Sequence, residues 1–134
     1  MGAIPVVETN RDRIVYILDD DVAVQESTTF LLATHDIAAQ AFGSPHAFLA
    51  AFDPDRASCL LLDLHMPEMS GIDVLKQLRS RGVTTPVIVI SGRSDASLDD
   101  LVKNLGAMAV LHKPPDNEEL IGLLSRAIAK AGNS

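Results

Sequence analysis

The strongest constraint on this chain is that short apolar runs alternate with segments whose apolar residues recur at helical spacing. The runs at 14–18, 59–62 and 87–90 are apolar at every position, which is typical of strands that are covered on both faces. Two further apolar runs lie at 37–42 and 107–111, and a helical pattern follows each of the five runs. Strand–helix alternation with short connections predicts a doubly wound α/β fold around a five-stranded parallel sheet.

Length and composition limit what such a fold can do. The 134 residues fit a single domain. A net charge of −7 argues against direct binding of nucleic acid or of an anionic membrane. A single cysteine, Cys59, cannot form an internal disulfide, which favours a cytoplasmic protein. Every apolar run is far shorter than the roughly 20 residues that span a bilayer.

Polar side chains stand where the predicted strands end. Asp19, Asp20 and Asp21 follow the first run, Asp63 follows the third, Ser91 the fourth, and Lys113 comes shortly after the fifth. The carboxyl ends of parallel strands share one edge of the sheet, so we expect these groups to meet there. Because crowded carboxylates repel one another, the cluster needs a cation, and hard oxygen ligands favour Mg²⁺.

These residue types suit phosphoryl transfer, which depends mainly on positioning and on neutralising charge. Asp63 is the best candidate nucleophile, and Lys113 can pair with it before reaction and hold a phosphoryl oxygen afterwards. Taken alone, the acidic triplet could simply cap the following helix, since Asp is a preferred N-cap residue. The joint placement of these groups on four strand ends favours a functional site.

Four motifs carry a resemblance to a known family. They are Ile17–Asp21, Leu61–Gly71 with its Met66-Pro67 pair, Val89–Gly92, and Lys113-Pro114. Over residues 13–129 the chain resembles the receiver domain of bacterial two-component response regulators, particularly the nitrogen-fixation type. The resemblance implies a flavodoxin-like sheet of strand order 2-1-3-4-5. It also implies a receiver domain at residues 13–131, preceded by an N-terminal extension of residues 1–12.

The resemblance assigns roles to the strand-end residues. Asp63 would accept a phosphoryl group from a phosphohistidine of a sensor histidine kinase or a phosphotransfer protein. Asp20, Asp63 and the backbone carbonyl of His65 would ligate Mg²⁺, and Asp19 would act through bound water. Ser91 and Lys113 would hold phosphoryl oxygens, and the Lys113–Pro114 peptide would be cis. The domain would catalyse only its own phosphorylation and dephosphorylation, so it would not be a conventional enzyme.

The resemblance also implies an output surface, made by the fourth helix, fifth strand and fifth helix, and allows a phosphorylation-dependent dimer. Two departures affect this output. Val110 stands where the family usually has Tyr or Phe, and Pro115 stands where close relatives are commonly aromatic. His65 and Arg93, each two residues after a site residue, are hypothesised to border the phosphoryl group and tune its lifetime.

Two rival functions remain open at this point. A phosphohydrolase of the haloacid dehalogenase type would use Asp19 as nucleophile and Asp21 as acid and base. Against it, Ala23 replaces the expected Thr or Val, and no later acidic pair completes the metal site. A degenerate receiver that only scaffolds is favoured by Val110 alone.

Overall fold

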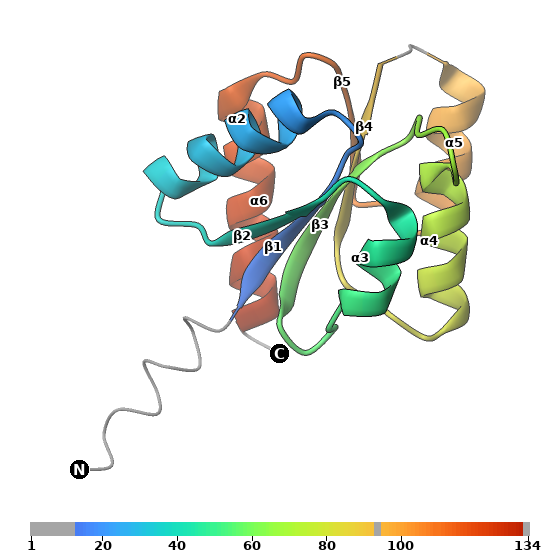
Figure 1. Ribbon diagram of the computed structural model, residues 1–134, viewed down its shortest axis with the longest axis horizontal. Helices are drawn as coiled ribbons and strands as arrows, with labels where there is room; N and C mark the ends of the chain where they lie inside the picture. Colours follow the sequence, from blue (N-terminus) through green and yellow to red (C-terminus); the bar gives the residue numbers. More distant parts are fainter. Residues whose placement is uncertain (1–12, 93–94, 133–134) are drawn as a thin grey trace.

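The computed structural model describes residues 13–92 and 95–132, so the predicted N-terminal extension and Arg93 lie outside the described residues. Its strands are β1 (Ile14–Leu18), β2 (Ala39–Phe42), β3 (Ala57–Asp63), β4 (Val87–Ser91) and β5 (Ala109–His112). All neighbouring pairs are parallel, and the order is β2-β1-β3-β4-β5 (Figure 1). The predicted doubly wound, flavodoxin-like sheet is therefore confirmed.

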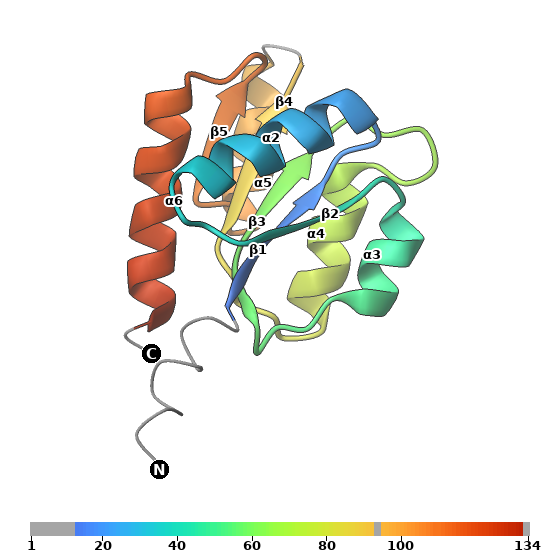
Figure 2. The ribbon, with the colours of Figure 1, turned by 60° about the vertical axis from the view of Figure 1, so that its left-hand side comes forward.

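Helices cover both faces of this sheet. They are α2 (Val22–Thr34), α3 (Pro45–Ala51), α4 (Gly71–Ser80), α5 (Ala96–Asn104) and α6 (Asn117–Gly132). Figures 1 and 2 show α2 and α6 on one face and α3, α4 and α5 on the other. The amino ends of four helices are capped by short polar side chains, each of which accepts a hydrogen bond from a backbone N–H of its helix. The capping residues are Asp21, Ser44, Ser70 and Asp95. Within the described residues, none of the helices is long and apolar enough to cross a bilayer.

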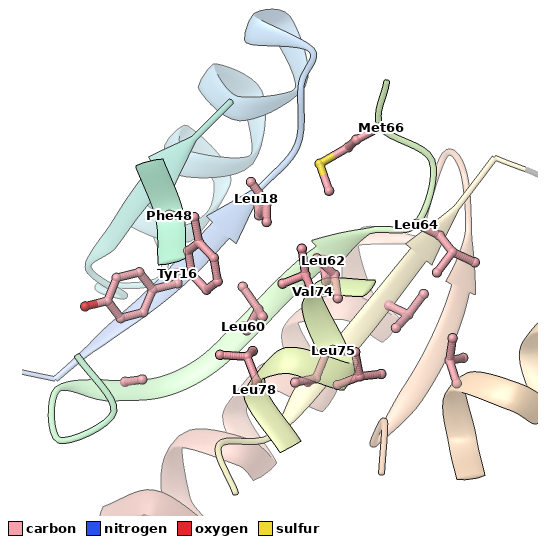
Figure 3. Close-up of a cluster of buried hydrophobic side chains, with 14 of the residues drawn as sticks. Tyr16, Leu18, Phe48, Leu60, Leu62, Leu64, Met66, Val74, Leu75 and Leu78 are labelled. Atoms are coloured by element: carbon pink, nitrogen blue, oxygen red, sulfur yellow. The ribbon is translucent and has the colours of Figure 1, made fainter. Parts of the chain in front are cut away.

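Each face of the sheet has its own apolar core, because successive strand residues point to opposite faces. Tyr16, Leu60 and Leu62 pack against α3 and α4 in one core (Figure 3). Cys59 and Leu61 point to the other core, where they join residues of α2 and α6. Strands that are apolar at every position are thus explained by burial on both sides, and the Cys59 thiol is completely buried.

The strand boundaries differ from the sequence prediction by one or two residues. Asp63 and Ser91 are the last residues of β3 and β4 rather than the first residues after them. The reason is register: Asp63 is the partner of Ile90, and Ser91 is the partner of His112, so neighbouring strands extend the ladder to both polar residues. The sheet therefore holds the backbone of both residues in place.

One arginine ties together the loops at the opposite edge of the sheet, where the strands begin. The Arg79 guanidinium, at the end of α4, donates to the backbone carbonyls of Val83, Thr85, Leu105 and Gly106 at 2.9–3.2 Å. Gly106 has φ +91, and a Cβ there would lie 3.0 Å from Arg79 Nε. This contact joins the α4–β4 loop to the α5–β5 loop.

Candidate functional site

The carboxyl edge of the sheet gathers three acidic side chains. Asp19, Asp20 and Asp63 each offer a carboxylate oxygen, and these atoms lie within 4.8 Å of one another. Asp19 and Asp63 are buried, with 4% and 3% of their surface exposed, while Asp20 is exposed. Oxygen ligands at this spacing suit a divalent cation such as Mg²⁺. The structure therefore brings together the three acids that sequence analysis had assigned to the metal.

The residues of the acidic triplet have different structural roles. Asp21 is the N-cap of α2, and its side chain accepts from the amides of Ala23 and Val24. The alternative reading of the triplet is thus correct for Asp21. Asp19 instead turns into the site, where its Oδ1 accepts from the Asp21 amide at 2.9 Å.

Sequence analysis missed a residue that holds Asp19. The Gln25 side-chain amide donates to the Asp19 carbonyl at 2.8 Å, and the Asp19 amide donates to the Phe42 carbonyl at 3.0 Å. A Cβ on Gly43 would lie 2.9 Å from Gln25 Nε2, so the absence of a side chain at Gly43 leaves room for this bond. Nothing in the sequence distinguishes a glutamine that bonds to the backbone, as Gln25 does, from a glutamine at the same helical position that points into solvent.

Lys113 neutralises part of the charge of the two buried acids. Its Nζ lies 3.3 Å from Asp19 Oδ2 and 3.4 Å from Asp63 Oδ1. Burial would lower the pKa of Lys113, but the charges of Asp63 and Asp19 outweigh it and raise that pKa. The amine therefore stays protonated, and its charge is shared by two carboxylates.

Asp63 remains incompletely neutralised despite Lys113. Burial, followed by the charge of Asp19, raises the pKa of Asp63 above its usual value of 3.8. The His65 amide, which donates to Asp63 Oδ1 at 3.2 Å, and Lys113 act in the opposite direction without cancelling the rise. One ammonium facing two buried carboxylates thus leaves negative charge for a further cation.

Ser91 and His65 contact each other beside Asp63. The Ser91 hydroxyl lies 3.4 Å from His65 Nε2, and the Ser91 carbonyl accepts from the Lys113 amide at 2.8 Å. Ser91 is buried, with 1% of its surface exposed. The predicted set of Asp63, Ser91 and Lys113 therefore lies at the same edge, with His65 joined to it through both its amide and its ring.

The start of α4 passes very close to the end of β3. The Gly71 amide donates to the Leu64 carbonyl at 3.0 Å. A Cβ on Gly71 would lie 2.5 Å from the Asp63 carbonyl oxygen and 2.9 Å from Leu64 Cα. This glycine, noted in the sequence only as part of a motif, fixes the path of the loop that follows Asp63.

Two features of the β5 region match the sequence analysis. The Lys113–Pro114 peptide is cis, as the resemblance implied. Val110 is partly buried and packs against the core on the α4 and α5 side. The position that is usually aromatic is thus an aliphatic core contact here.

Comparison with known proteins decides the family. The model of the response regulator receiver domain matches residues 15–125. The chain belongs to that family. Phosphorylation and Mg²⁺ binding at an acidic cluster are general features of receiver domains of two-component response regulators. The acidic cluster of this chain consists of Asp19, Asp20 and Asp63.

Relatives of this receiver domain include regulators of the nitrogen-fixation type. Response regulator protein TodT of Pseudomonas putida is 37% identical over 123 residues, covering 92% of this chain and 54% of TodT. Transcriptional regulatory protein FixJ of Azorhizobium caulinodans is 37% identical over 117 residues, covering 87% of this chain and 56% of FixJ. The chain therefore spans about half the length of these relatives.

Solved structures agree with the fold of this receiver domain. The crystal structure of FixJ-N is 34% identical, with a TM-score of 0.78, covering 87% of this chain and 94% of that one. The response regulator StyR gives 27% identity and a TM-score of 0.83, covering 90% of this chain and 61% of that one. These matches do not favour the phosphohydrolase alternative that would use Asp19 as nucleophile.

Proposed function

We propose that this receiver domain accepts a phosphoryl group on Asp63 from a phosphohistidine of a sensor histidine kinase or a phosphotransfer protein. The observation that carries the proposal is the buried Asp63 carboxylate, which shares Lys113 with Asp19 at the end of β3. Its raised pKa means that the carboxylate is poorly stabilised and ready to bond to an electrophile.

The transfer conserves atoms and charge. An oxygen of the Asp63 carboxylate bonds to phosphorus while the phosphorus–nitrogen bond of the donor breaks, and the released imidazole nitrogen takes a proton from solvent. Lys113, held at 3.4 Å from Asp63 before reaction, then pairs with a phosphoryl oxygen. The Ser91 hydroxyl donates to a second oxygen after leaving His65, and the resulting acyl phosphate is hydrolysed by water.

The acidic cluster fits a resident Mg²⁺. Two buried carboxylates and one exposed carboxylate offer oxygens within 4.8 Å, and Lys113 is the one cation that pairs with them among the described residues. We assign the direct ligands to Asp20, Asp63 and the His65 carbonyl, and a water-mediated contact to Asp19. When bound, Mg²⁺ neutralises charge that builds up on the phosphoryl oxygens.

We assign the output surface to β5 and to the helices that follow β4 and β5, which are α5 and α6. Effectors or a second phosphorylated receiver would dock there. The Val110 side chain is smaller and rotates less freely than an aromatic one, so phosphorylation changes this surface through backbone shifts and repacking at Ser91 and Lys113. The receiver unit comprises residues 13–131, acts in the cytoplasm, and performs no chemistry other than its own phosphorylation and dephosphorylation.

Intact mass after incubation with a small phosphodonor and Mg²⁺ tests the proposal. The native chain should gain one phosphoryl group that hydroxylamine removes, and Asp63→Ala should gain none. Asp21→Asn is the matched control, because Asn also caps helices well and Asp21 lies beside the site. Equal labelling of Asp63→Ala, or steady phosphomonoester turnover that requires Asp19 and tolerates Asp63→Ala, would overturn it.

A further inference from the structure

A hollow lies at the amino edge of the sheet, opposite the acidic cluster. Arg13 precedes β1, Pro86 precedes β4 and Met108 precedes β5, and all three line the hollow together with the last turns of α6. Figure 2 shows the end of α6 beside the starts of β1 and β3. The volume is about 510 Å³, which is within the roughly 300–1,000 Å³ that is usual for small-molecule sites. We call it the amino-edge hollow.

The charge of the amino-edge hollow is opposite to that of the protein. Among the described residues, all four charged side chains that line it are basic, namely Arg13, Arg79, Arg126 and Lys130. The whole chain has a net charge of −7 and eleven Lys and Arg residues, so over a third of its basic side chains meet here. Positive charges gathered in a concave surface focus the field and attract anions.

These cations have no carboxylate partner in the part of the chain that the structure describes. The ion pairs there join His112 to Asp99 and Lys113 to Asp19 and Asp63. Arg126 and Lys130 are exposed and stand four residues apart on α6, which places them on the same side of the helix. Both side chains are therefore available to a ligand.

Arg79 supplies an independent indication of an unneutralised positive charge. Its guanidinium is half-buried and donates to four neutral carbonyls, and burial lowers the pKa of Arg79. Carbonyl oxygens satisfy the donors but leave the net charge in place. An anion in the hollow would offset that charge in a partly desolvated setting, where screening by salt is weaker.

We propose that the amino-edge hollow binds a small organic phosphate of about nucleotide size. Arginine and lysine recognise phosphate oxygens through charge-assisted hydrogen bonds, and the Thr84 hydroxyl adds a neutral donor. Pro54, Met108 and Ala131 supply apolar wall for the organic part. The site lies at the far edge from Asp63, so it is separate from the phosphoacceptor chemistry.

Calorimetric titration with ADP and with inorganic pyrophosphate, in Mg²⁺-free buffer, tests this site. We expect saturable one-to-one binding of ADP that weakens at least tenfold in the double variant Arg126→Gln, Lys130→Gln. Lys76→Gln with Lys103→Gln is the matched control, because it removes two exposed charges that do not line the hollow. That control and Asp63→Ala should bind ADP as the native chain does, with amide shifts in NMR spectra centred on Gly106 and Thr84.

Three results would contradict the proposal in distinguishable ways. Absence of saturable ADP binding, or equal weakening in the control pair, would show that the hollow attracts anions only through its electrostatic field and has no specific binding site. Loss of binding in Asp63→Ala would place the ligand at the acidic edge instead. Equal affinity for pyrophosphate and ADP would show that the hollow binds the phosphate groups alone, and would contradict binding of the organic part by the apolar wall.

Discussion

Replacing Gly71 by alanine tests how the fold positions Asp63. The added methyl carbon would lie 2.5 Å from the Asp63 carbonyl oxygen and 2.9 Å from Leu64 Cα. Both atoms belong to the backbone, so neither can rotate away as the end of a flexible side chain would. Accommodating the methyl group must move the start of α4 away from the end of β3.

Two opposing effects set the change in the free energy of unfolding. Forcing an extra carbon into a packed region typically costs about 1–3 kcal/mol. Alanine is favoured over glycine in a helix interior by about 1 kcal/mol, and by less at the first helical position, which Gly71 occupies. The steric effect should win, so we expect Gly71→Ala to lower the free energy of unfolding by about 1–2 kcal/mol.

Urea unfolding measures this change, and Gly122→Ala is the matched control. Gly122 lies within α6, and nothing lies within 4 Å of its added Cβ. The same substitution should therefore stabilise the protein there, by about 0.5–1 kcal/mol. Phosphorylation of Gly71→Ala by a small phosphodonor should also be slower, because Asp63 shifts with the loop. Equal stability of the two alanine variants would refute the steric reasoning.

Three further predictions concern charge. Asp63→Asn should be more stable than the native chain at pH 7, because the pKa of Asp63 is raised in the fold and its ionisation costs stability. That advantage should fade as pH falls through the folded pKa toward 3.8, and an equal gain in exposed Asp55→Asn would contradict it. Mg²⁺ at ten times its Kd should raise the free energy of unfolding by about 1.4 kcal/mol. Thermal unfolding should show no such rise in Asp63→Asn, and a native chain indifferent to Mg²⁺ would count against the metal site. Arg79→Met should cost about 2–4 kcal/mol in urea unfolding through four lost carbonyl bonds. Arg81→Met, at an exposed position, should cost far less, and similar losses in both would show that the carbonyl bonds contribute little.

Part of the site could be predicted because the end of a strand is visible in the local sequence. An apolar run followed by Asp63, Ser91 or Lys113 marks a strand with a polar residue at its carboxyl end, and the parallel sheet brings those ends to one edge. Sequence alone could not divide the acidic triplet. Whether Asp21 caps α2 or turns into the site depends on the path of the chain after β1.

The remaining contacts depend on where distant segments pass each other. Gln25 and Asp19 are only six residues apart, but Gly43, which follows β2, leaves the space for their bond. Lys113 meets Asp19 and Asp63 although 94 and 50 residues separate it from them in the chain. The basic residues of the amino-edge hollow are scattered from Arg13 to Lys130 and share no sequence motif. The sequence by itself determined the strands, because a strand buried on both faces is apolar at every position, and it determined which polar residues stand at the strand ends. The tertiary structure decided which side chains meet across loops and helices, because those distances arise from register and packing between segments that are remote in sequence.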